Sequence, residues 1–149
     1  MASRAANLPL EEHVFIGLLR AADGLLQGVE RLLKAHGLSP AQYNVLRILR
    51  GAPPEGLSCR EIGERMLTRD PDMTRLLDRL EKNGLVIRER QKTDRRVVAT
   101  RSTPKALEAL RRLDQPVREI HRRQLRHLAG ARLKTLLALL EEVRMVPSG

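Results

Sequence analysis

At 149 residues the chain fits one domain over 1–149, long enough to bury roughly 68 to 70% of its unfolded surface without disulfide support. Lysine and arginine number 28 against 18 aspartates and glutamates, and the formal net charge of +10 favours a polyanionic partner, with double-stranded DNA as the first candidate. No apolar run approaches the roughly 18 residues of a membrane-spanning helix, and Cys59 is the single cysteine, so we expect a cytoplasmic protein with no internal disulfide and no membrane partner.

The first predicted element is a long helix from Leu10 to about Ala35, closed by His36 and Gly37. Its apolar residues recur at helical spacing, at Val14, Leu18, Leu19, Ala22, Leu25, Leu26, Val29, Leu32 and Leu33. A helix that packs along one side of its own domain needs a narrower stripe. The width of this stripe suggests burial on two sides, one of them against another subunit.

The next two predicted helices begin with the same local pattern. Ser39 with Gln42, and Ser58 with Glu61, have the spacing of a capping box, in which the serine and the residue three positions later satisfy each other's backbone N–H groups. Pro40 suits the first position of the earlier helix. The two predicted helices span 40–51 and 59–66, with a loop between them.

A fourth helix is predicted over about 71–83, with Asp70 as its cap and Pro71 at its first position. The helical period then assigns a buried face to Met73, Leu76, Leu77 and Leu80. It leaves an outward face of Thr74, Arg75, Asp78, Arg79 and Lys82. Gly84 suits the left-handed residue that ends a helix, so the C-terminal end is sharply specified.

Two β-branched runs around a polar turn predict a basic hairpin over about 86–102. Its cations are Arg88, Arg90, Lys92, Arg95, Arg96 and Arg101, and only Glu89 and Asp94 oppose them within the hairpin. Charges that protect an edge strand from aggregation explain some of these, but not an arginine pair at the turn, where insertion into a narrow minor groove is favoured. A carboxylate is repelled by phosphate, so Asp94 is interpreted as an internal brace that aims Arg96.

Two further helices complete the chain. One starts at Thr103 and Pro104 and is expected to bend or break at Pro116. The last starts at about Gly130 and carries the apolar residues Leu133, Leu136, Leu137, Leu140 and Val143. The arginines at 118, 122, 123 and 126 are interpreted as a solvated face, with phosphate contacts as the alternative.

Three short helices followed by a basic hairpin have the order of a winged helix-turn-helix, so the predicted fold is mainly α with a small β-hairpin wing. The third helix of such a module enters the major groove, where Arg75 and Arg79 point at bases or phosphates from the same side and Thr74 reaches a base edge. An ordinary solvated helix face with ion pairs, such as Arg75 with Asp78, remains the alternative.

The segment from Met73 to Glu81, then Gly84-Leu85-Val86, Arg90, Asp94-Arg95-Arg96 and Thr103-Pro104-Lys105, resembles the MarR family of bacterial regulators. The resemblance implies a winged helix-turn-helix lobe over 38–103 and a helical dimerisation lobe over 10–36 and 104–146. It implies that Thr74 and Arg75 contact operator DNA, that Asp94 braces the wing and that Arg96 enters the minor groove. The expected DNA-contacting residues are Thr74, Arg75, Arg79, Lys92, Arg95 and Arg96, and the expected dimer interface includes Val14, Leu18, Leu136, Leu140 and Val143.

Two positions depart from the family pattern. Asp70 and Asp72 stand where the family more often has small hydroxyl residues, so each carboxylate either accepts from a cytosine or simply caps the helix. Ala106 replaces the glycine that usually follows Thr-Pro-Lys, which is expected only to tighten the start of that helix.

We therefore expect a sequence-specific transcriptional regulator, a homodimeric repressor of a palindromic operator that a small-molecule effector releases. The effector is implied by the resemblance alone, since no residue indicates a pocket. Two alternatives remain, a constitutive nucleoid protein and a protein-interaction module on the same fold, which Asp70 and Asp72 make conceivable. Salt dependence without sequence preference would favour the nucleoid protein.

The sequence offers no constellation for an enzyme, a cofactor or a metal. The four histidines have no ligand spacing, and no phosphate loop or nucleophile motif is present. Cys59 lies at a predicted helix start, where a thiolate is favoured, but a free cysteine usually behaves as a small hydrophobe. We therefore expect Cys59 to be buried or inert rather than a redox sensor.

Overall fold

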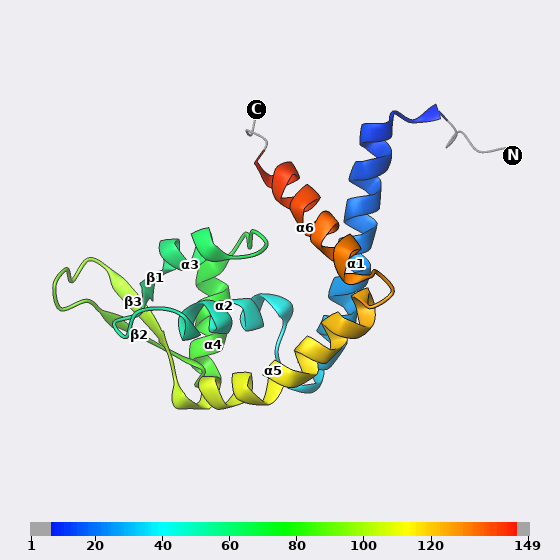
Figure 1. Ribbon diagram of the computed structural model, residues 1–149. Coiled ribbons are helices and arrows are strands. Elements are labelled where there is room, and N and C mark those ends of the chain that lie inside the picture. The colour runs from blue at the N-terminus through cyan, green and yellow to red at the C-terminus, as the bar shows by residue number, and fades with distance from the viewer. Residues whose placement is uncertain (1–6, 146–149) are drawn as a thin grey trace, which may run out of the picture.

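The computed structural model describes residues 7–145 and shows one lobe from which two helices project (Figure 1). Its elements are α1 (Leu10–Ala35), α2 (Pro40–Arg50), β1 (Leu57–Ser58), α3 (Cys59–Arg65), α4 (Met73–Lys82), β2 (Val86–Arg90), β3 (Val98–Ser102), α5 (Pro104–Leu125) and α6 (Gly130–Arg144). The lobe contains α2, α3, α4 and the sheet. In Figure 1, α5 runs beneath it toward α1 and α6, which extend away from the lobe.

The predicted capping boxes are confirmed at α2 and α3. The Ser39 hydroxyl accepts from the Gln42 backbone N–H at 3.1 Å, and the Gln42 side chain accepts from the Ser39 N–H at 3.0 Å. Ser58 and Glu61 form the same reciprocal pair at 3.1 and 2.8 Å. Both helices therefore begin where local side-chain chemistry places them.

The C-terminal end of α4 is also as predicted, but its start is two residues later than expected. Asp72, not Asp70, is the cap, and it accepts from the Arg75 N–H at 3.1 Å. Asp70 instead accepts from the Asp72 N–H at 2.8 Å, which makes a tight turn that holds Pro71 outside the helix. The helix ends at Lys82, and Gly84 just beyond it has a φ of 72°, the left-handed conformation that favours glycine.

The predicted hairpin is part of a three-stranded antiparallel sheet in the order β1-β3-β2. The sequence analysis missed β1 because two residues are too short to show alternation. Leu57 pairs with Thr100, and Gly56 just before it has a φ of 85° and lies where a Cβ would be 2.3 Å from the Thr100 carbonyl oxygen. Strand β3 begins at Val98, so Arg96 belongs to the turn.

The apolar core joins the lobe to α5 and to the C-terminal end of α1. Its buried members include Leu33, Leu46, Ile62, Leu77, Leu80, Leu110 and Leu113. Helix α5 continues through Pro116 without interruption, and Figure 1 shows it curving along its length. No residue of α6 is buried, and only Val29 and Leu33 of α1 are buried, so much of both helices lacks packing partners within the described chain.

Candidate nucleic-acid interface

Helix α4 presents one buried face and one open polar face. Leu76, Leu77 and Leu80 face the core, while Thr74, Arg75 and Arg79 are exposed. Neither arginine forms an ion pair with any residue of 7–145. The alternative in which Arg75 pairs with Asp78 is therefore wrong, because Asp78 binds Arg88 instead. Two unpaired guanidinium groups remain one turn apart on the same face.

Arg88 of β2 binds two carboxylates on α4. Its Nη2 lies 3.0 Å from Glu81 Oε1 and also contacts Asp78, and its backbone N–H donates to Glu81 at 3.2 Å. The hydrogen bond from Arg88 lowers the pKa of Glu81, and the same pair raises the pKa of the guanidinium. Arg88 therefore ties the wing to α4 and is not a free wing cation, a role that sequence spacing did not indicate.

The remaining wing cations divide into restrained and free groups. Arg101 pairs with Glu89 at 3.1 Å, and Arg90 donates to the Arg95 carbonyl oxygen at 2.8 Å. Lys92 and Arg95 are exposed at the turn and form no ion pair within the described chain. The opposing carboxylates are thus more numerous than the sequence suggested, because α4 contributes two of them.

Asp94 holds the turn of the wing from within. Its carboxylate accepts from the Arg96 backbone N–H at 3.1 Å and from the Arg96 Nε at 3.2 Å. These hydrogen bonds lower the pKa of Asp94. The Arg96 side chain is nevertheless 91% exposed. Asp94 therefore braces the backbone and the Nε of Arg96 while the side chain stays exposed. The contact of Arg96 with DNA stays a prediction.

Cys59 is exposed at the first position of α3, so of the two expected states, buried or inert, the buried one is wrong and the inert one stays a prediction. It borders a hollow of about 290 Å³ together with Thr74 and Thr100. The helix starts at Cys59, so its side chain projects at the end of the helix instead of into the core.

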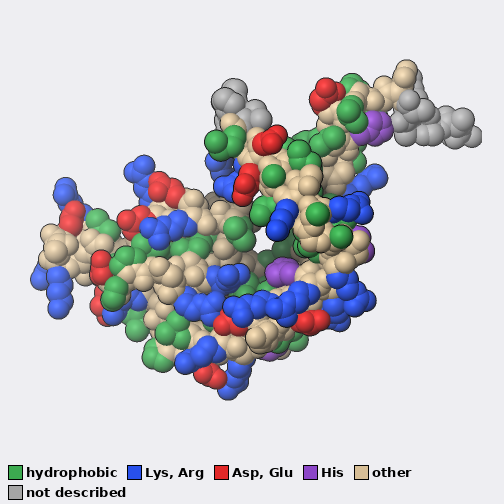
Figure 2. Space-filling view, in the orientation of Figure 1, with side chains coloured by type: hydrophobic (Ala, Val, Ile, Leu, Met, Phe, Trp, Pro, Cys, Tyr) green, Lys and Arg blue, Asp and Glu red, His purple; other side chains and the backbone are tan. Residues whose placement is uncertain are grey.

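A second group of charges joins α2 to α5. Arg50 makes two parallel hydrogen bonds to Asp114, at 2.9 and 3.0 Å. They lower the pKa of Asp114, and the nearby positive charges of Arg118 and Arg47 lower it further. Figure 2 shows lysine and arginine side chains gathered over α2 and α5 and at the far tip of the wing. The ion pair is a direct polar link between the lobe and α5.

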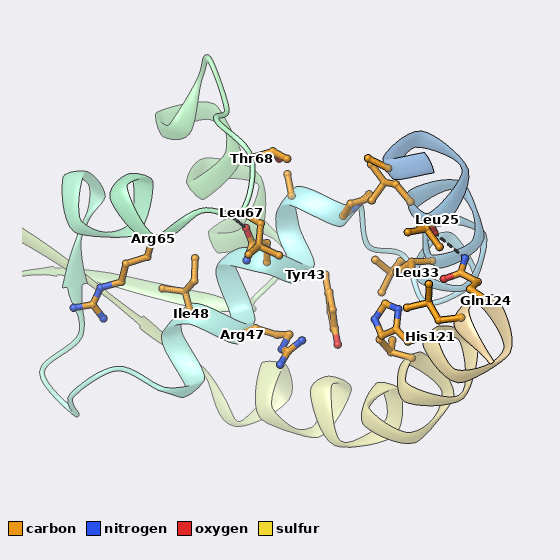
Figure 3. A pocket seen from close by; sticks show the side chains of 18 residues that line it. Leu25, Leu33, Tyr43, Arg47, Ile48, Arg65, Leu67, Thr68, His121 and Gln124 are labelled. Carbon is orange, nitrogen blue, oxygen red and sulfur yellow. Dashed lines mark hydrogen bonds between the residues drawn. The ribbon is translucent and has the colours of Figure 1, made fainter. Parts of the chain in front are cut away.

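A cavity of about 650 Å³ lies between α1, α2, α5 and the segment that follows α3 (Figure 3). Its walls are mostly apolar, with Leu25, Leu33, Val117 and Ile48 among them. The polar groups along it include Tyr43, Arg47, His121 and Gln124, and the Arg47 guanidinium lies 5.8 Å from the centre of the Tyr43 ring. The sequence did not reveal this cavity, because its walls come from four separate segments.

The projecting helices carry exposed apolar side chains. On α1 these include Val14, Phe15 and Leu19, and on α6 they include Leu137, Leu140 and Val143. Leu18 and Leu136, which were also expected at a dimer interface, are half-buried. Over residues 7–145 no helix is long and apolar enough to cross a membrane. Nor does that part of the chain bring three potential metal-binding side chains together.

The helix order, the exposed arginines on α4 and the three-stranded wing define a winged helix-turn-helix protein. The family model described as "MarR family" matches residues 36–97. A crystal structure of a MarR transcription factor from Planctomyces limnophilus is 40% identical, with 91% of this chain and 98% of that chain covered and a TM-score of 0.69. The chain belongs to the MarR family of transcription regulators.

Two further comparisons extend along most of the chain. The homoprotocatechuate degradative operon repressor of Escherichia coli is 25% identical over 133 residues, which cover 89% of this chain and 88% of that protein. A mutant MarR from E. coli, crystallised in complex with operator DNA, is 24% identical, with a TM-score of 0.79 and coverage of 92% of this chain and 99% of that chain. The first is a relative in sequence, and the second shows the same fold.

Proposed function

We propose that this protein is a homodimeric repressor that binds a palindromic operator through α4 and the wing. The observation that carries the proposal is the open face of α4, where Thr74, Arg75 and Arg79 lie exposed and both arginines lack carboxylate partners within the described chain. A guanidinium without a protein partner is suited to bidentate contact with guanine in the major groove. The fold shared with a MarR protein in complex with operator DNA supports the same docking.

The residues divide between recognition and positioning. Arg75 lies in the first turn of α4, and N-terminal residues of a recognition helix contact base edges, so we assign base contacts to Thr74 and Arg75. Arg79 lies one turn further and contacts bases or phosphates from the same side. Lys92, Arg95 and Arg96 provide the positive charge of the wing, with Arg96 directed at the minor groove from its brace on Asp94.

Dimerisation would bury the exposed apolar faces of the projecting helices. An exposed apolar face on α1 and another on α6 suggest a self-complementary contact, which a twofold axis would bury on both subunits. Val14, Leu18, Leu136, Leu140 and Val143 remain the proposed interface residues. A twofold dimer would present its two α4 helices about one helical turn apart, some 34 to 36 Å, in adjacent major grooves.

The cavity between α1, α2 and α5 is the proposed effector site. It has the volume of a small-molecule site and mostly apolar walls. Its wall also includes Leu67 and Thr68, which lead directly toward α4, and the Leu67 N–H is held by the Asn44 side chain at 2.8 Å. A bound molecule would touch both the helices of the proposed dimer lobe and the segment before the recognition helix. It would thereby favour one spacing of the two DNA-binding lobes.

A salt-series binding assay tests the repressor proposal. The purified full chain is titrated onto the DNA upstream of its own gene and onto a scrambled duplex of equal composition. We expect binding to the upstream DNA to be tighter by roughly 10³-fold or more at physiological salt. Equal and steeply salt-dependent binding to both duplexes would instead favour a nucleoid protein. Absence of binding to either would favour an interaction module.

The proposal has two corollaries. The protein acts by binding, with no catalytic step of its own, and its work on operator DNA places it in the cytoplasm with the bacterial chromosome. The binding assay supports this use of the fold if retardation of the duplex needs neither a nucleotide nor a metal ion, and if the duplex is recovered unchanged afterwards.

A further inference from the structure

Arginines from two helices form one surface along α5. On α5 and its C-terminal cap, successive arginines recur at spacings of seven, four and four residues, which places them on one side of the helix. Arg50 of α2 binds Asp114 on α5, and Arg47 and Arg118 both lie close enough to lower the pKa of that carboxyl. The α5 basic surface is defined as the exposed residues Arg47, Arg50, Arg111, Arg118, Arg122 and Arg126. Figure 2 shows the lysine and arginine side chains gathered over these two helices.

The α5 basic surface carries more positive charge than its neighbours neutralise. Three carboxylates pair with its arginines: Glu108, Asp114 and Glu119. Arg47, Arg118 and Arg126 form no ion pair with any residue from 7 to 145. Arginines four residues apart are about 6 Å apart along the helix axis, which is within the Debye length of about 8 Å at physiological salt. Their charges therefore repel one another, and a bound polyanion would relieve that repulsion.

The composition of this surface favours phosphate over a protein partner. The exposed large apolar side chains of residues 7–145 lie on α1, α6, β2, β3, the loop after α3 and just past α6, and none lies on α2 or α5. Protein interfaces depend on apolar anchors, whereas DNA interfaces are more polar and much more positively charged. From Arg111 to Arg126 the row extends about 22 Å, and a duplex offers about six phosphates per strand over that length.

The α5 basic surface lies apart from the open face of α4. Helix α5 packs mainly on α1 and α2, whereas α4 packs mainly on α2, α3 and β2. Both helices bury leucines in one core, so their outer faces point away from that core on different sides. Figure 1 shows α5 starting at the base of the sheet and running away from the wing. A duplex held by α4 and the wing therefore leaves the α5 basic surface open.

We propose that the α5 basic surface binds the phosphate backbone of a second DNA duplex, so that the protein bridges two DNA segments. Such contacts add affinity without reading sequence, because phosphates carry no base information. The inference goes beyond the proposed repressor and does not depend on which operator α4 reads.

A capture assay with two unrelated duplexes tests the bridge. One duplex of scrambled sequence is fixed to beads and saturated with the full-length protein, and unbound protein is washed away. A fluorescent duplex of a different scrambled sequence is then added over a series of salt concentrations. The fluorescence retained on the beads measures bridging. Neither duplex contains the upstream DNA, so the result is independent of operator recognition.

The test variant combines Arg118→Gln, Arg122→Gln and Arg126→Gln, which removes three charges and keeps residues that favour a helix. We expect it still to bind the fixed duplex but to retain at least about tenfold less of the fluorescent duplex than the unchanged protein does. The slope of log retention against log salt should become shallower by about 2.7, since each lost phosphate contact accounts for about 0.9.

The matched control removes the same charge from α6. Arg132→Gln, Lys134→Gln and Arg144→Gln are combined, because all three side chains are exposed and form no ion pair within 7–145. This variant should retain the fluorescent duplex as the unchanged protein does. Circular dichroism and sedimentation equilibrium check that both variants keep the fold and the oligomeric state.

Four results would overturn the proposal. These are no retention by the unchanged protein, undiminished retention by the α5 variant, an equal loss in both variants, or displacement of the fluorescent duplex by polyglutamate as effective as by unlabelled duplex. The third would make net charge the cause, and the fourth would favour an acidic protein chain as the partner. Bridging without sequence preference in the salt-series assay would refute only the repressor, whereas specific operator binding without bridging would refute only this inference.

Discussion

The winged lobe buries its apolar side chains within its own chain, whereas the projecting helices leave many of theirs exposed. In the lobe, α2, α3, α4 and the sheet bury their apolar faces against one another and against α5, and two capping boxes fix the starts of α2 and α3. In α6 no residue is buried, and Phe15 on α1 is 62% exposed. One region is completed by its own chain, while the other has the apolar surface of an interface without its second half. The difference separates the part that folds around itself from the part that is expected to assemble.

The largest expected effect is loss of the dimer through a substitution in the projecting helices. Leu140→Glu on α6 would place a charge in the proposed dimer interface twice, once from each subunit, at a cost of several kcal/mol. We expect a shift from dimer to monomer at micromolar concentration, measured by sedimentation equilibrium. Leu67→Glu is the matched control, because Leu67 is more exposed than Leu140, 86% against 36%, yet lies outside both projecting helices. If both variants dissociated, exposure and not the helix face would explain the result.

A core substitution tests the self-sufficient lobe. Leu80 is fully buried where α4 meets the core, so Leu80→Ala is expected to lower the free energy of unfolding by ~2–5 kcal/mol. Because the change lies away from the proposed interface, the loss should be the same at low and high protein concentration. Denaturant titration at two concentrations measures it. A loss that depended on concentration would show that the lobe relies on the dimer for its own stability.

Two arginines within the lobe should differ in what they contribute to operator binding. Arg75→Ala is expected to cost ~1–3 kcal/mol and to relax sequence preference, because a base contact is lost. Arg96→Ala should weaken binding to all duplexes more evenly and reduce the salt dependence. Arg60→Ala, on an exposed ion pair of α3, serves as the control. Competition binding with single-base operator variants separates the two effects, and a uniform loss in Arg75→Ala would contradict its assignment.

The smallest expected effect concerns the link between the two regions. Arg50 holds the pKa of Asp114 below its ordinary value, so this group contributes stability that is present above the unfolded pKa and lost as pH falls through the folded pKa. Both side chains are partly exposed, and the pair is expected to contribute about 1 kcal/mol or less. Asp114→Asn should lower stability at neutral pH and flatten its decline below about pH 4. Thermal melts between pH 3 and pH 7 measure this, and a parallel decline in both proteins would exclude the ion pair as its source.

Contacts between residues close together in the sequence could be predicted, whereas contacts between residues far apart in the sequence could not. Ser39 and Ser58 were assigned as caps because their partners lie three residues away, and Asp94 was paired with Arg96 for the same reason. The predicted start of α4 was wrong because Asp70 and Asp72 are both residues that can cap a helix. In the structure Asp70 accepts from the Asp72 N–H in a turn, and Asp72 caps the helix. The open arginines of α4 followed from the helical period.

The sequence by itself determined the order of the helices, the basic wing, the ends of α2 and α4 and the apolar stripes of α1 and α6, since each of these depends on local periodicity, capping or turn chemistry. Only the tertiary structure decided that Arg88 ties the wing to α4, that Arg50 and Asp114 join α2 to α5, and that four segments enclose a cavity. The physical reason is that an ion pair or a cavity wall forms between residues that folding brings together. Their spacing along the chain, up to 99 residues between Leu25 and Gln124, leaves no periodic trace.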